Sequence, residues 1–147
     1  MGLIRALASS ASGLAAQRVR MDVVSSNVAN IETTSTPEGG PYQRKVVRFA
    51  SGDPAMPFSN MIRRFTGGAD TGVVLTQVGV DEESQGRSVY DPAHPDADGE
   101  GFVAMPNVDM VQEMTDLTSA NRSYQANVTV LNAVKQMALR ALDISSR

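Results

Sequence analysis

The sequence predicts a mainly α-helical chain with a small β element. Two long terminal helices pair as an antiparallel coiled coil, and a turn-rich antiparallel β segment lies between them. All seven Pro and ten of the twelve Gly fall within residues 37–106, and Pro breaks helices while Gly weakens them. Apolar residues in both outer segments recur at alternating intervals of four and three, the spacing of a heptad seam. We therefore expect a helix over 1–36, a β and turn segment over 37–106, and a helix over 107–147.

The composition of the 147-residue chain excludes several classes of protein. A net charge of −3 argues against a domain that charge holds to nucleic acid. The absence of Cys excludes disulfides, thiol nucleophiles and Cys-ligated zinc, and we expect no cofactor. No stretch reaches the ~18 apolar residues of a membrane span. Arg5 interrupts the apolar run at the N-terminus, so we expect neither a membrane span nor a cleaved signal peptide.

The apolar stripe of the first segment is interrupted by polar residues at Ser10 and Gln17. The members expected to make assembly contacts are Leu3, Leu7, Leu14, Met21, Val24, Val28 and Ile31. The flanks of the stripe are rich in Ala and Ser, which allow a partner helix to approach closely. An ordinary bundle core is the alternative interpretation of such a stripe.

The last segment repeats this spacing, with polar interruptions at Asn121 and Lys135. The apolar members expected to make assembly contacts are Met114, Leu117, Tyr124, Val128, Leu131, Met137 and Leu142. A wider apolar face toward the C-terminus implies more than one neighbouring helix. We expect the two stripes to pack on each other and the remaining apolar surface to bind neighbouring subunits.

The middle segment predicts short strands joined by turns. The strand candidates, rich in β-branched and aromatic residues, are 42–49, 73–80, 88–90 and 102–105. Several Pro and Gly between the first two candidates predict a mobile loop over 50–72. Pro106 ends the segment, and either Asn107 or Asp109 caps the helix that follows.

The acidic run from Asp91 to Glu100 is the best candidate for a chemical site. The residues that a metal-dependent or carbohydrate-acting enzyme could use there are Asp91, His94, Asp96 and Asp98. An EF-hand loop does not fit, because His94 and Met105 would occupy its first and bidentate ligand positions. A solvated turn set by Pro and Asp is the simpler interpretation, so we expect no enzyme. A cytoplasmic coiled-coil adaptor is the other alternative.

The string VVSSNVANIETT at 23–34 resembles the N-terminal signature of the bacterial flagellar rod, hook and hook-associated proteins. That signature is a serine-rich run followed by Asn, an apolar residue, Ala, Asn, two variable residues and Thr. The matching residues are Ser26, Asn27, Ala29, Asn30 and Thr33. Glu32 departs from the pattern, which more usually holds a small residue, Asn or Asp there.

The C-terminal strings resemble the last helix of the same family. They occupy 107–114, 122–128 and 131–137 and add Asn127 to the expected assembly residues. The stretches 33–42 and 89–98 resemble the proximal-rod members. The resemblance extends over 3–49 and 79–144, while 50–78 matches nothing.

The resemblance implies a structural subunit of the proximal rod in the flagellar basal body. Such subunits assemble through their terminal helices into the drive shaft that transmits motor torque and surrounds the export channel. The implied partners are other copies, neighbouring rod proteins, the flagellar export apparatus and the MS-ring region. The implied location is the periplasmic rod, reached through flagellar type III export without a cleaved signal peptide.

Overall fold

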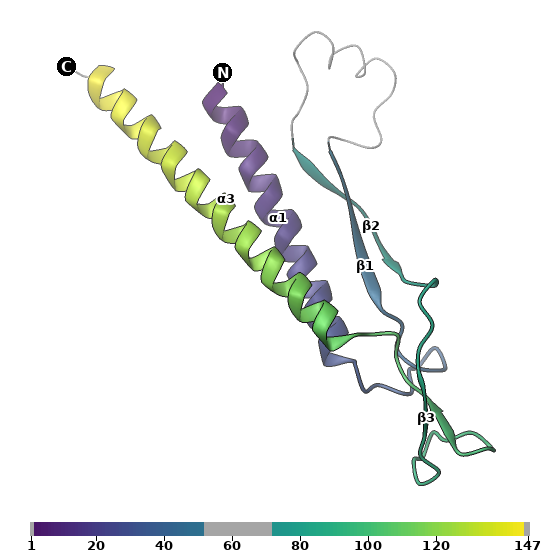
Figure 1. Ribbon diagram of the computed structural model, residues 1–147. Coiled ribbons are helices and arrows are strands. Elements are labelled where there is room, and N and C mark those ends of the chain that lie inside the picture. The colour runs from purple at the N-terminus through teal and green to yellow at the C-terminus, as the bar shows by residue number, and fades with distance from the viewer. Residues whose placement is uncertain (1, 52–71, 146–147) are drawn as a thin grey trace, which may run out of the picture.

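The computed structural model describes residues 2–51 and 72–145 (Figure 1). Its elements in chain order are α1 (Gly2–Ala29), β1 (Lys45–Ser51), β2 (Val73–Val80), β3 (Ser88–Tyr90), β4 (Phe102–Ala104) and α3 (Met110–Ser145). Long helices at both ends and small antiparallel sheets between them confirm the predicted fold class at this level. Most of the predicted loop over 50–72 lies outside the described residues.

The helices α1 and α3 pack side by side in opposite directions, so both chain ends lie at the same end of the molecule (Figure 1). Burial along α3 recurs every seven residues, at Glu113, Ala120, Asn127 and Val134. A second half-buried row alternates with it at Leu117, Tyr124, Leu131 and Ala138. Because α1 is the element that contacts α3, these two rows form the surface that faces α1.

The face of α3 that packs on α1 differs from the predicted stripe. The half-buried row that includes Leu117 and Tyr124 belongs to that stripe, but Met114 and Leu142 are exposed by 58% and 65%. The prediction that these two residues pack on the N-terminal helix of the same subunit is therefore wrong. The predicted stripe misses the second row that faces α1 because that row contains Glu113 and Asn127, which are polar.

The β1–β2 hairpin is antiparallel, with a register shift between Arg48 and Phe49. Both of its strands contact α1, which lies between the hairpin and α3 (Figure 1). The amide of Val73 donates a hydrogen bond to the Ser12 hydroxyl at 3.0 Å, and the Arg20 guanidinium lies 5.9 Å from the Phe49 ring centre. A two-stranded sheet is marginally stable alone, so these contacts with α1 support it.

The β3–β4 pair forms a second antiparallel hairpin, which projects beyond the helix ends away from the chain termini (Figure 1). Val103 is the buried side chain of its two strands. Tyr90 and Phe102 meet edge to face with ring centres 5.2 Å apart, an arrangement that adds to the stability of a cross-strand pair.

Polar side chains end α1 and begin α3. The Asn30 side-chain amide donates to the Ser26 carbonyl at 2.8 Å, and no non-glycine residue in the described ranges has a positive φ. Asn30 therefore ends the helix through its side chain. Asp109 caps α3, since its carboxylate accepts from the amides of Val111 and Gln112 at 2.8 and 3.4 Å.

Within 2–51 and 72–145, neither helix is long and apolar enough to cross a membrane.

Candidate assembly site

The most deeply buried large side chains of the described residues are polar. Glu113 has no exposed surface and Asn27 is 1% exposed. Buried polar and charged groups are costly unless they are hydrogen-bonded or paired. Both lie where the last turn of α1, the start of β1 and the first turn of α3 meet, and we call Asn27, Tyr42, Arg44 and Glu113 the polar junction.

Asn27 uses all of the usual hydrogen-bonding capacity of its side-chain amide. Its Nδ2 donates to the Lys45 carbonyl at 2.9 Å and to Glu113 Oε2 at 3.0 Å. Its Oδ1 accepts from the Tyr42 hydroxyl at 3.0 Å and from the Lys45 amide at 2.9 Å. One side chain of α1 thus binds both the start of β1 and the first turn of α3.

The carboxylate of Glu113 is paired with Arg44. Arg44 Nε donates to Glu113 Oε1 at 2.7 Å, and its terminal nitrogens lie 3.6 Å from the carboxylates of Asp81 and Asp116. Burial alone lowers the pKa of Arg44, but the hydrogen bond and charge of Glu113 and the charges of Asp81 and Asp116 outweigh it and raise the pKa. Arg44 is therefore a permanent cation that compensates the buried carboxylate.

Asn107 fastens the backbone around the polar junction. Its Oδ1 accepts from the Arg44 amide at 2.7 Å, and its Nδ2 donates to the carbonyls of Asp81 and Ser84 at 2.9 and 3.0 Å. The Asp81 amide in turn donates to the Arg44 carbonyl at 2.8 Å. The segment before α3 is thereby held against the open end of the β1–β2 hairpin, where β1 begins and β2 ends. Asn107 has this role in place of the cap considered from the sequence.

The remaining residues of the asparagine motif extend the polar junction along the chain. The Thr33 hydroxyl donates to Asn30 Oδ1 at 3.1 Å, and the Thr33 carbonyl accepts from the Tyr42 amide at 3.0 Å. Ser26 Oγ lies 3.5 Å from the Tyr42 hydroxyl oxygen, whereas Ala29 is exposed. Most of the motif therefore fixes the turn after α1.

Asp81 gives the polar junction an acid-sensitive contact. The hydroxyl and amide of Ser84, the amide of Glu83 and the charge of Arg44 lower the pKa of Asp81, against an opposing effect of burial. A depressed pKa in the folded state stabilises the fold above the unfolded-state pKa, and this contribution is lost as the pH falls through the folded pKa.

Asp81→Asn is expected to destabilise the protein at pH 7 and to have a smaller effect below pH ~4, where the unfolded carboxyl takes up a proton. Urea unfolding at pH 7 and at acid pH measures this difference. Glu82→Gln, which changes the exposed neighbouring carboxylate, is the control. An equal effect of Asp81→Asn at both pH values would contradict the prediction.

The acidic run makes turn contacts. Asp98 Oδ1 accepts from the amides of Glu100 and Phe102 at 2.9 Å each, and Asp91 Oδ1 accepts from the Ala93 amide at 3.2 Å. These are backbone bonds typical of Asx turns. The structure, over the residues that it describes, brings together no group of three or more His, Asp or Glu suited to a metal ion.

Two further residues of the acidic run also make local contacts. Asp96 Oδ2 accepts from the Thr34 hydroxyl at 2.7 Å. The Asp96 amide donates to His94 Nδ1 at 3.1 Å. The first of these contacts ties the run to the turn that follows α1.

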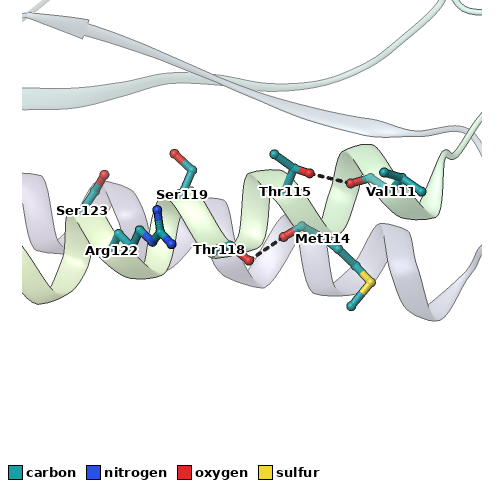
Figure 2. A pocket seen from close by; sticks show the side chains of 7 residues that line it. All are labelled: Val111, Met114, Thr115, Thr118, Ser119, Arg122 and Ser123. Atoms are coloured by element: carbon teal, nitrogen blue, oxygen red, sulfur yellow. Dashed lines mark hydrogen bonds between the residues drawn. The ribbon is translucent and has the colours of Figure 1, made fainter.

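The outer face of α3 carries exposed apolar residues and a shallow hollow (Figure 2). Its lining residues all belong to α3 and are Val111, Met114, Thr115, Thr118, Ser119, Arg122 and Ser123. The hydroxyls of Thr115 and Thr118 donate to the carbonyls of Val111 and Met114 at 2.8 and 2.9 Å. Since these hydroxyl protons are used within the helix, the two threonines offer mainly their methyl groups beside Val111 and Met114, while Arg122 and two serines complete the lining. We call the seven lining residues the outer face.

The structure distributes the sequence-predicted assembly residues over several environments. Val24 is buried, Met114, Met137 and Leu142 are exposed, and the side chain of Leu3 lies outside those described. The half-buried members are Leu7, Leu14, Met21, Val28, Ile31, Leu117, Tyr124, Asn127, Val128 and Leu131.

Comparisons with known proteins agree at both chain ends and over nearly the whole length. The family model described as flagella basal body rod protein matches residues 7–35, and that described as flagellar basal body rod FlgEFG protein C-terminal matches 100–144. The flagellar basal-body rod protein FlgC of Bacillus subtilis is 48% identical over 140 residues, covering 92% of this chain and 93% of its own. The chain belongs to the FlgC family of flagellar basal-body rod proteins.

Other FlgC proteins show the same full-length similarity. Those of Borreliella burgdorferi and Salmonella typhimurium are 41% and 40% identical, each over 98% of both chains. The chain is therefore a structural rod subunit that acts in motility, is located in the flagellar basal body and assembles with other basal-body components. The similarity gives no support to an enzyme built on the acidic run or to a cytoplasmic adaptor.

Within this FlgC-family chain, sequence reasoning found the motif asparagine but missed its partners. Tyr42, Arg44, Asp81 and Glu113 are not among the residues predicted to make contacts between the elements. The available indication was periodicity, because Glu113 stands seven residues before Ala120 in the row that faces α1. The predicted stripe passes through the apolar Met114 and not through the adjacent charged Glu113.

Proposed function

We propose that this rod subunit assembles through the outer face of α3, which binds other copies and neighbouring rod proteins. One observation carries the proposal: Val111 and Met114 are exposed by 73% and 58%, although they adjoin a helix surface that is packed on α1. Exposed apolar surface of this kind is typical of interaction sites. Subunits joined in this way form a tube. This tube is the proximal part of the drive shaft, which transmits motor torque and surrounds the export channel.

We further propose that α1 and α3 form an antiparallel coiled coil, the stem of the subunit. The seven-residue recurrence of burial along α3 supports this geometry. A stiff helix pair suits torque transmission, which requires many simultaneous contacts and no catalysis. The half-buried residues of the N-terminal stripe, such as Leu14 and Met21, keep accessible surface that a neighbouring subunit would cover.

The export apparatus and the MS-ring region are the remaining proposed partners, and the periplasmic rod is the proposed location. Export through the flagellar type III apparatus requires an unfolded chain, and a chain without Cys passes through and refolds with no disulfide to form. Asn27 near the end of α1 holds β1 and α3. We therefore propose that α1 is kept after export and not removed as a signal peptide.

Met114→Glu tests the outer face. Burying a Met side chain contributes about 1.5–3 kcal/mol, and a carboxylate buried in its place is costly. We expect cells that carry this variant to lose swimming, measured in soft agar. Since Met114 is exposed in the subunit, circular dichroism of the purified chain should show unchanged helix content.

Gln112→Glu is the matched control, because it adds the same charge at an exposed position of the same helical turn, outside the hollow. We expect it to swim normally. Normal swimming of the Met114→Glu cells would refute assembly through the outer face.

A further inference from the structure

One hydrogen bond and one close steric contact join α1 to α3 in one common register. Asn27 Nδ2 donates to Glu113 Oε2 at 3.0 Å. The Asn127 amide lies over Gly13, where an added Cβ would be 3.0 Å from Asn127 Nδ2. Gly13 precedes Asn27 by 14 residues and Glu113 precedes Asn127 by 14 residues. In an antiparallel pair, the two contacts are therefore two heptads apart on both helices.

The apolar seam alone does not define this register. Burial along α3 repeats every seven residues, so a seam shifted by seven again places core positions opposite core positions. Such a shift moves α3 by about 10 Å along α1. It also separates Asn27 from Glu113. Asn127 then lies opposite a residue that has a side chain, and no longer opposite Gly13. A buried carboxylate that loses its partners is strongly unfavourable.

We propose that these two contacts select the register of the helix pair, with Asn27 and Asn127 as positioning residues. Asn27 is itself held by Tyr42 and by the backbone of Lys45, so the register of the helices and the attachment of β1 are set together. The register fixes where Met114 lies relative to the β1–β2 hairpin. That consequence for assembly rests on the proposed function, whereas the register is a property of one subunit.

Disulfide formation in the full chain measures the register, because the natural sequence has no Cys. Ala16 follows Gly13 by three residues and Tyr124 precedes Asn127 by three, so the observed register places them opposite each other. Ala16→Cys with Tyr124→Cys reports this register, and Ala16→Cys with Leu131→Cys reports a register shifted by one heptad. On oxidation of the dilute chain, we expect the first pair to form at least about tenfold more intramolecular disulfide.

The ratio to follow is the disulfide yield of the Ala16→Cys, Tyr124→Cys pair divided by that of the Ala16→Cys, Leu131→Cys pair. Removal of the positioning contacts should lower this ratio. Asn127→Ala leaves the polar junction intact and removes the side chain that a shifted register would crowd, so it is expected to lower the ratio about threefold. Asn127→Ala with Glu113→Leu is expected to lower it about tenfold. Asn132→Ala, at an exposed position of α3, is the matched control and should leave the ratio unchanged. Circular dichroism shows whether the double variant keeps its helices; if it does not, the Asn127→Ala result alone decides.

Two results would overturn the proposal. One is that, in the otherwise unchanged chain, the Ala16→Cys, Tyr124→Cys pair forms no disulfide, or no more than the Ala16→Cys, Leu131→Cys pair. The other is an unchanged ratio of yields in Asn127→Ala. Because the experiment uses a single subunit in solution and no assembled rod, failure of the proposed assembly surface would leave the cross-linking result unaffected.

Discussion

Asn27→Ala is expected to lower the free energy of unfolding by about 3–5 kcal/mol. The substitution takes a hydrogen bond from four buried or part-buried groups: the Lys45 amide and carbonyl, the Tyr42 hydroxyl, which keeps only the 3.5 Å contact with Ser26, and one oxygen of Glu113. Each unsatisfied buried group costs about 1–3 kcal/mol, reduced where water can enter the gap. Urea unfolding followed by circular dichroism measures the loss.

Two further variants sharpen this prediction. Asn132→Ala truncates an exposed asparagine of α3 and should change stability by less than about 0.5 kcal/mol. Asn27→Asp keeps the acceptor oxygen but places a second carboxylate beside Glu113, so we expect a loss at least as large as that of Asn27→Ala. If Asn27→Ala and Asn132→Ala unfold at the same urea concentration, the polar junction does not hold the elements together.

Arg44→Ala is the second large expected effect, again about 3–5 kcal/mol. It removes the cation that lies 2.7 Å from the fully buried Glu113 carboxylate, and breaking a buried pair leaves an uncompensated charge. The Arg44 side chain is only 14% exposed, so water does not replace it readily. Chemical unfolding at pH 7 gives the change in free energy.

A double-mutant cycle with Glu113→Leu separates the pair from its surroundings. Arg44→Ala combined with Glu113→Leu should be less destabilising than the sum of the two single variants, because the double variant leaves no buried carboxylate to pair. Arg44 retains Asp81 and Asp116 in the Glu113→Leu single variant. Strict additivity of the two losses would show that Arg44 and Glu113 act independently.

The arrangement of helices and strands was predictable because it rests on local physics. Pro and Gly are confined to the middle segment and heptad spacing to the ends, and the observed helices α1 and α3 follow that division. The strand candidate at 73–80 coincides with β2, and 42–49 overlaps β1. Such features depend on propensity and periodicity within one segment.

The polar junction was predictable only in part because its partners are distant in sequence. Asn27 stands out in the motif, but its bond to Glu113 spans 86 residues. The pattern of α3 also could not tell that the row of Glu113, and not the adjacent row of Met114, lies beside the row of Leu117 on the face toward α1, since Met114 is apolar and Glu113 is charged. Burial of Glu113 depends on the position of Arg44 in three dimensions, which no local pattern encodes.

The most direct test of assembly through the outer face is the amount of the chain in isolated basal bodies. Basal bodies are purified from cells that produce either Met114→Glu or Gln112→Glu at equal levels, and the rod subunit is quantified by immunoblot. We predict that Gln112→Glu is present at the level of the unchanged chain and that Met114→Glu is absent. Incorporation of Met114→Glu at the control level would contradict the account.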